Sequence, residues 1–132
     1  MEGISINWLA VVVAALSSFP VGFLWYGPLF GKAWQKHVGL DAEAAARANK
    51  GVMFGAAFVL AFVQAASFAF FLGPTPFPFS ALYGLVAGLC WVGAAFGVQY
   101  LFEAKSWKLS LINAGYNTVV FTLIGAIIGA WH

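Results

Sequence analysis

The residues of this chain that could do chemistry are few, and most of them are uncharged. Gln99 and Glu103 are four residues apart, so in a helix they lie on one face. Asn113 and Asn117 have the same spacing, and Tyr116 stands beside them. Amides and phenols at these positions either bind a small solute or lipid head group, or form hydrogen bonds between helices. Both interpretations stay open.

Residues with catalytic or metal-binding side chains are scarce and scattered. The one cysteine, Cys90, excludes an internal disulfide and a cysteine-based metal cluster, and His37 and His132 are far apart. Ser17, Ser18 and Cys90 are the candidate nucleophiles, but no general base follows from their surroundings in the sequence. We therefore expect no enzymatic activity, no metal site and no cofactor.

The composition identifies lipid as the solvent of this chain. Its 132 residues are 63% hydrophobic and 8% charged, with a mean hydropathy of +0.91. A soluble domain carries about 25% charged residues, so this chain lacks the polar groups for a water-facing surface. The net charge of +2 is too small to indicate binding of nucleic acid.

The elements that position the polar residues are four continuous apolar runs, at about 6–27, 51–73, 80–102 and 109–131. Each is long enough to cross a hydrocarbon core, which takes about 20 helical residues. They lack the period-two alternation of a membrane β-barrel. The sequence thus predicts an all-α integral membrane protein, a single transmembrane domain built as a four-helix bundle. Gln64 falls within the second run and adds a polar group at depth.

The distribution of charge predicts the orientation in the membrane. All six Lys and Arg residues fall at 28–50 and 103–108, whereas the connection at 74–79 has no charge. Basic loops remain in the cytoplasm, so both termini are expected on the periplasmic or extracellular face of a bacterial inner membrane. The pair Gln99 and Glu103 and the pair Asn113 and Asn117 then lie in the cytoplasmic halves of antiparallel neighbours, where they can meet.

Glycine pairs spaced four apart indicate close helix packing. In the last two runs these pairs are Gly84/Gly88, Gly93/Gly97 and Gly125/Gly129. Gly84 and Gly93 are nine residues apart, about 900° of α-helix, so the two pairs of the third run should face opposite ways. We therefore expect the third helix between two neighbours, one from this chain and the other from another protomer or subunit.

The two halves of the chain show a similar order of residues. A Phe, a Lys, a Trp and then Asn-x-Gly occur at Phe30, Lys32, Trp34 and Asn49 in the first half, and at Phe102, Lys105, Trp107 and Asn113 in the second. Either the bundle consists of two parallel two-helix repeats, as in some transporters, or two basic loops are similar by chance.

Three segments resemble one known family: Asn7-Trp8, the stretch GFLWYGPLFGKAW at 22–34, and Asn113-Ala114-Gly115-Tyr116. Together they resemble the bacterial membrane family catalogued as domain of unknown function 1761. The resemblance implies a small four-span inner-membrane protein with no assigned activity, and it supplies no catalytic residues.

Two functions are compatible with these features. The first is a non-enzymatic membrane protein that assembles with itself or serves as an accessory subunit of a larger membrane complex. The alternative is a small-solute or lipid transporter or channel, with a polar site at the cytoplasmic ends of the third and fourth helices. The expected partners are membrane lipids, further copies of the chain or other membrane subunits.

Overall fold

The computed structural model describes residues 6–33, 49–104 and 106–131. Within these ranges the chain is helical and has no strand. Four helical segments are long and apolar enough to cross a membrane: Trp8–Leu29, Gly51–Leu72, Phe79–Phe102 and Trp107–Ala130. The predicted all-α, four-span architecture is confirmed. Residues 34–48 of the first predicted basic loop, and Lys105 of the second, lie outside the described residues.

The first segment consists of helix α1 (Trp8–Leu24) and a π-helical turn, η1 (Trp25–Leu29). Asn7 caps α1, because its side-chain oxygen accepts a hydrogen bond of 3.1 Å from the Ala10 amide. η1 contains Pro28, which has no N–H to donate, and a non-helical backbone at Gly27. The first span therefore ends in a widened, kinked turn.

Helix α4 (Lys50–Leu72) forms the second span, with Asn49 as its N-cap and Gly73 as its C-cap. Asn49 accepts a hydrogen bond of 3.1 Å from the Val52 amide. At the other end, Gly73 has φ of +56°, a conformation that glycine adopts without a steric penalty. This glycine reverses the chain toward the third span.

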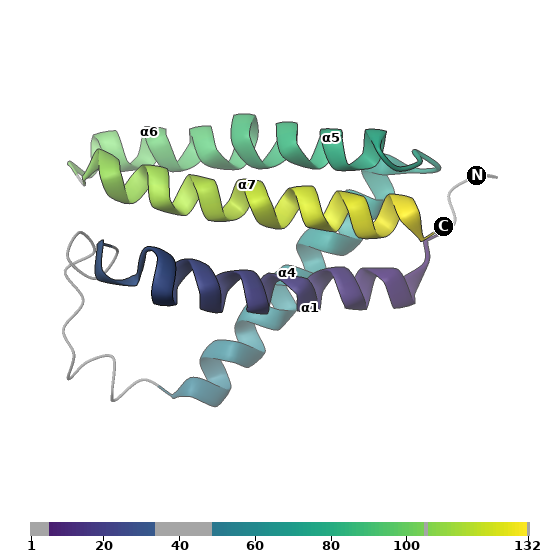
Figure 1. The fold of residues 1–132 in the computed structure, drawn as a ribbon, viewed down its shortest axis with the longest axis horizontal. Helices are drawn as coiled ribbons and strands as arrows, with labels where there is room; N and C mark the ends of the chain where they lie inside the picture. Colours follow the sequence, from purple (N-terminus) through teal and green to yellow (C-terminus); the bar gives the residue numbers. More distant parts are fainter. Residues whose placement is uncertain (1–5, 34–48, 105, 132) are drawn as a thin grey trace.

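The third span combines helix α5 (Phe79–Val86), π-helix η2 (Ala87–Gly93) and helix α6 (Ala94–Phe102). Helix α7 (Trp107–Ala130) follows, and Ser106 caps it by accepting a hydrogen bond of 3.1 Å from the Lys108 amide. The third span and α7 run side by side along their whole length (Figure 1).

The helices form a layer of three with the fourth laid across it. Figure 1 shows α7 between α1 and the third span, while α4 crosses α1 diagonally. The core lies where α4 crosses, and it includes Ala14 of α1, Ala65 of α4 and Ile124 of α7. Residues 51–57, in the first half of α4, are all exposed. α4 therefore packs through its second half and diverges from the bundle at its first.

Both ends of the described chain lie at the same end of the bundle. The Asn7 side-chain amide donates a hydrogen bond of 2.8 Å to the Trp131 carbonyl, and Figure 1 shows the start of α1 and the end of α7 at the same end of the bundle. An even number of spans requires this placement.

The six glycines predicted to pack helices lie along one interface, between the third span and α7. A Cβ added to Gly88 would lie 2.7 Å from Thr118 Cα, and one added to Gly93 would lie 3.2 Å from Ala114 Cβ. Gly84 likewise packs against the backbone of α7 and Gly97 lies nearest to Ser110, whereas Gly125 and Gly129 pack against Ser80 of α5. Both glycine pairs of the third span thus face α7.

The prediction that these two pairs face opposite ways was wrong, and η2 gives the physical reason. A π-helix closes i→i+5 hydrogen bonds, so it holds at least one more residue than α-helix with the same number of turns. Each extra residue shifts the rotation by about 100°, which brings Gly84 and Gly93 to within about 80° of one another. Among the described helices, both glycine pairs of the third span therefore pack on the same neighbour, α7.

Candidate functional site

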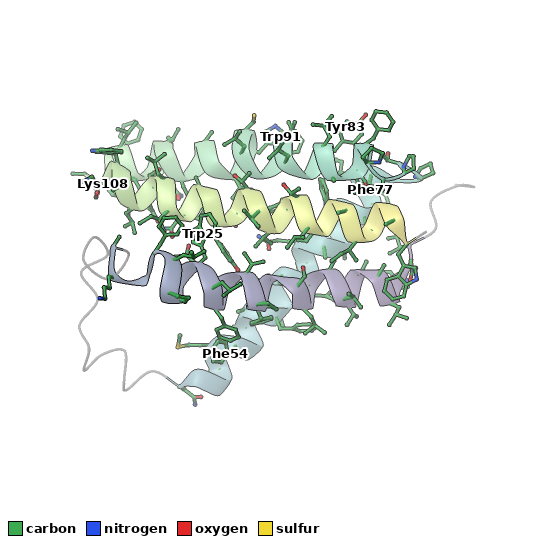
Figure 2. All side chains as sticks on the ribbon, viewed as in Figure 1. Trp25, Phe54, Phe77, Tyr83, Trp91 and Lys108 are labelled. Atoms are coloured by element: carbon green, nitrogen blue, oxygen red, sulfur yellow. The ribbon has the colours of Figure 1, made fainter. Side chains whose placement is uncertain are left out.

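The π-helical turn η1 places two aromatic side chains against the first third of α7. Trp25 Nε1 donates a hydrogen bond of 2.8 Å to the Ile112 carbonyl, and Figure 2 shows this ring between α1 and α7. The ring lies over Gly115, where an added Cβ would come within 2.7 Å of Trp25 Cζ2. A residue without a side chain at 115 is thus what lets the indole approach α7.

Asn113 joins the two halves of the chain through its side-chain amide. The Tyr26 hydroxyl donates a hydrogen bond of 2.5 Å to Asn113 Oδ1, and Asn113 Nδ2 donates one of 2.8 Å to the Tyr100 hydroxyl. One residue of α7 therefore bonds to η1 and to α6 at once. Between apolar helices, such a network fixes which helix faces meet.

Tyr116 and Asn117 continue this polar face toward the middle of α7. The Tyr116 hydroxyl donates a hydrogen bond of 3.1 Å to the Ser18 carbonyl. The centroids of the Tyr116 and Tyr26 rings are 5.2 Å apart. Asn117 Nδ2 donates a hydrogen bond of 2.9 Å to the Asn113 carbonyl within the helix. Asn117 Oδ1 has no hydrogen bond to the described residues, so it can accept one.

A cavity of about 710 Å³ lies beside this face, between α1, α4 and α7. Its polar lining is uncharged and comprises Ser18, Tyr26, Gln64, Tyr116 and Asn117. Its aromatic wall is Phe19, Phe23 and Phe54, whose rings meet edge to face with centroids 6.1 to 6.3 Å apart across α1 and α4. The site therefore offers hydrogen bonds at one side and apolar surface at the other.

The structure brings four of the six predicted polar residues to this site. Asn113 organises it, while Tyr116, Asn117 and Gln64 line the cavity. Gln99 is exposed and lines a separate cavity of about 320 Å³ with Trp91 and other residues of the third span. Figure 2 shows Trp91 on the edge of the bundle away from α7.

The position expected for Gln99 is held by the next residue, Tyr100. The extra residue in η2 turns α6 by about 100°, which is one helical position. Glu103 is exposed beyond the last turn of α6, so it is not among the cavity residues of the described structure.

Four residues that form hydrogen bonds in the site were not predicted to belong to it: Ser18, Trp25, Tyr26 and Tyr100. The sequence places the three aromatic ones near the membrane boundary, where they are expected as interfacial anchors. Gly27-Pro28 was the available signal, because this pair interrupts a helix and re-aims the side chains before it.

The segments in contact here, η1 and the first half of α7, are among those that resemble one family. The family profile described as protein of unknown function (DUF1761) matches residues 9–129. This chain belongs to the DUF1761 family. No curated protein and no solved structure matches it.

In this DUF1761 protein, the polar groups that line the cavity can form hydrogen bonds but carry no charge. Amide, phenol and alcohol groups are uncharged near neutral pH, and they hold a ligand through hydrogen bonds and contact area. The described residues include no group of three or more His, Cys, Asp or Glu side chains placed to hold a metal ion.

Proposed function

We propose that this DUF1761 protein is a non-enzymatic membrane protein that binds an amphiphilic molecule, a lipid or lipid-like solute, in the cavity between α1, α4 and α7. The observation that carries the proposal is the cavity itself, whose volume of about 710 Å³ falls within the range typical of ligand pockets. This develops the transporter alternative predicted from the sequence, with the site moved from the third and fourth spans to the first, second and fourth.

Gln64 supports an occupant in this cavity. Its side chain is half-buried in the second span and lines the cavity, and it has no hydrogen bond to the described residues. In hydrocarbon an unpaired amide costs several kcal/mol, so such a group is expected to have a partner. A polar head group in the cavity supplies that partner.

The route into the cavity runs sideways from the bilayer. Phe23, Met53 and Phe54 line the cavity and are 62%, 51% and 44% exposed, so the cavity opens on the surface between α1 and the first half of α4. An amphiphile dissolved in the membrane can enter there without crossing water.

The charged groups support the predicted sidedness in a bacterial inner membrane. Lys32 and Lys108 are exposed at the end of the bundle opposite the termini, and the Lys108 ammonium lies 5.7 Å from the centre of the Trp107 ring. This end is proposed to face the cytoplasm, with both termini periplasmic.

The test is retention of lipid by the purified protein. The wild type, extracted from membranes in mild detergent, is expected to carry a bound lipid in native mass spectrometry. Gln64→Leu is expected to lose most of it, whereas Gln99→Leu, the same substitution outside the cavity, retains it. Protein that carries no lipid and takes none from a membrane extract contradicts the proposal.

A second function, assembly with itself or with a larger complex, is favoured by the first half of α4. Val52 and Val59 are 64% and 59% exposed, and a Cβ added to Gly55 would meet no atom within 4 Å. Small residues let helices approach closely in lipid, so this face can pack against a further helix. Light scattering corrected for detergent tests it, and a strict monomer that co-purifies with no other protein contradicts it.

A further inference from the structure

We infer that the ligand of this cavity is a lipid with an uncharged, hydroxyl-bearing head group, such as a monoacylglycerol, rather than a phospholipid. This inference rests on the proposed function and names the ligand class for the same site. It follows from three features: the hydrogen-bonding groups that remain available, their depth in the membrane, and the shape of the apolar wall.

The available hydrogen-bonding groups call for a partner that both donates and accepts. Tyr26 and Tyr116 already donate their hydroxyl hydrogens to Asn113 and Ser18, and Asn117 Nδ2 donates to a carbonyl of its own helix. Asn117 Oδ1, an acceptor, and the Gln64 carboxamide, which can donate and accept, have no hydrogen bond to the described residues, and Asn117 Nδ2 has a second N–H to donate. A hydroxyl group satisfies both side chains, because it donates one hydrogen bond and accepts others.

The depth of these two residues excludes a charged head group. Gln64 lies about 20 Å along the helix from Gly51 and about 12 Å from Leu72. Asn117 lies about 15 Å from Trp107 and about 20 Å from Ala130, so both are well inside a hydrocarbon core about 30 Å thick. No Lys or Arg is among the described lining residues, so a phosphate here would be buried without a counter-ion.

The apolar wall suits a single chain that leaves the cavity sideways. Phe19, Phe23 and Phe54 line the side that opens toward lipid, where the tail of the ligand can continue into the bilayer. A cavity of about 710 Å³ holds a head group and part of one chain, as for drug-sized ligands. The ligand thus sits with its head at mid-membrane, between α4 and α7.

Three commercially available lipids with the same oleoyl chain separate these requirements: monooleoylglycerol, 1-oleoyl lysophosphatidic acid and methyl oleate. The second adds a phosphate to the first, and the third lacks the hydroxyls. Each is titrated into delipidated full-length protein, and binding is read by native mass spectrometry. We expect monooleoylglycerol to bind at least about tenfold more tightly than either of the others.

Variants then locate the head group. Loss of one neutral hydrogen bond weakens binding by about fivefold, so Gln64→Leu and Asn117→Leu should each weaken monooleoylglycerol binding to that extent or more. Gln99→Leu should leave it unchanged. If Gln64→Leu binds monooleoylglycerol as tightly as the wild type does, the head group does not lie beside Gln64 and the assignment is overturned.

The wild-type titrations decide the ligand class even if a variant fails to fold. Tighter binding of lysophosphatidic acid overturns the uncharged head group but leaves the proposed lipid-binding function standing. Equal binding of methyl oleate overturns the role of the hydroxyl in the same way. Binding of none of the three, together with no lipid retained from the membrane, overturns both the inference and the proposed function.

Discussion

The Tyr26 hydroxyl donates a 2.5 Å hydrogen bond to Asn113 Oδ1, although the two residues are 87 positions apart in the chain. The same Asn113 donates to Tyr100, so one side-chain amide connects the first, third and fourth spans. These contacts hold η1 against α7, and they fix Tyr26, which lines the cavity. The cavity wall therefore depends on a small polar network in an otherwise apolar bundle.

Tyr26→Phe should destabilise the protein by about 1–3 kcal/mol, because it leaves the half-buried Asn113 Oδ1 without this donor. Thermal unfolding in detergent measures the effect. Tyr83→Phe is the matched control, since Tyr83 is 50% exposed on the edge of the bundle away from α7 (Figure 2). Equal midpoints for the two variants would show that the network contributes nothing to stability.

Gly115→Ala should destabilise by about 1–3 kcal/mol, because the added methyl overlaps the Trp25 ring and must displace it. Gly55→Ala introduces the same methyl into open space on α4 and should be neutral or stabilising by up to about 1 kcal/mol. Thermal unfolding of both variants compares them. The opposite order would contradict the docking of η1 on α7.

Gly88→Ala and Gly97→Ala compare two glycines of the third span on the interface with α7. A Cβ at 88 would lie 2.7 Å from Thr118 Cα, which is backbone and cannot rotate away, whereas at 97 the nearest atom is Ser110 Oγ at 3.9 Å. We expect a loss of about 1–3 kcal/mol for the first and little change for the second. A larger loss of stability for Gly97→Ala than for Gly88→Ala would contradict the close contact of Gly88 with α7.

The spans could be predicted from the sequence, whereas the faces they present could not. Continuous apolar runs identify membrane helices by length, which does not depend on local geometry. Helix faces were derived by assuming α-helical rotation throughout, and η2 breaks this assumption between Gly84 and Gly93. The same extra residue exchanges Gln99 for Tyr100 at the contact with Asn113.

The candidate site was predicted by residue type more than by position. Asn113, Tyr116 and Asn117 stood out as polar residues in an apolar helix, and Gln64 did so for the same reason. Their partners on η1 could not be predicted, because a kink at Gly27-Pro28 has no fixed direction in sequence. The proposed repeat stays a prediction: Asn49 caps α4, whereas Asn113 lies inside α7.

The proposed orientation predicts which residues are accessible from each side of the membrane. In a Cys90→Ala background, Trp131→Cys should react with a membrane-impermeant maleimide in spheroplasts, because it follows the last span at the proposed periplasmic end. Ser106→Cys, at the opposite end, should react only after the cells are permeabilised. The reverse pattern would invert the topology.

The central claim, that the cavity between α1, α4 and α7 holds a lipid, is tested most directly by photo-crosslinking. A monoacylglycerol with a diazirine near its head group is irradiated with the full-length protein in bilayers, and modified residues are mapped by mass spectrometry. We predict modification concentrated on Gln64 and Asn117 and on Ala57, which also lines the cavity, and displacement by excess monooleoylglycerol. Modification spread over outward-facing residues such as Trp91 and Leu101, without displacement, would contradict it.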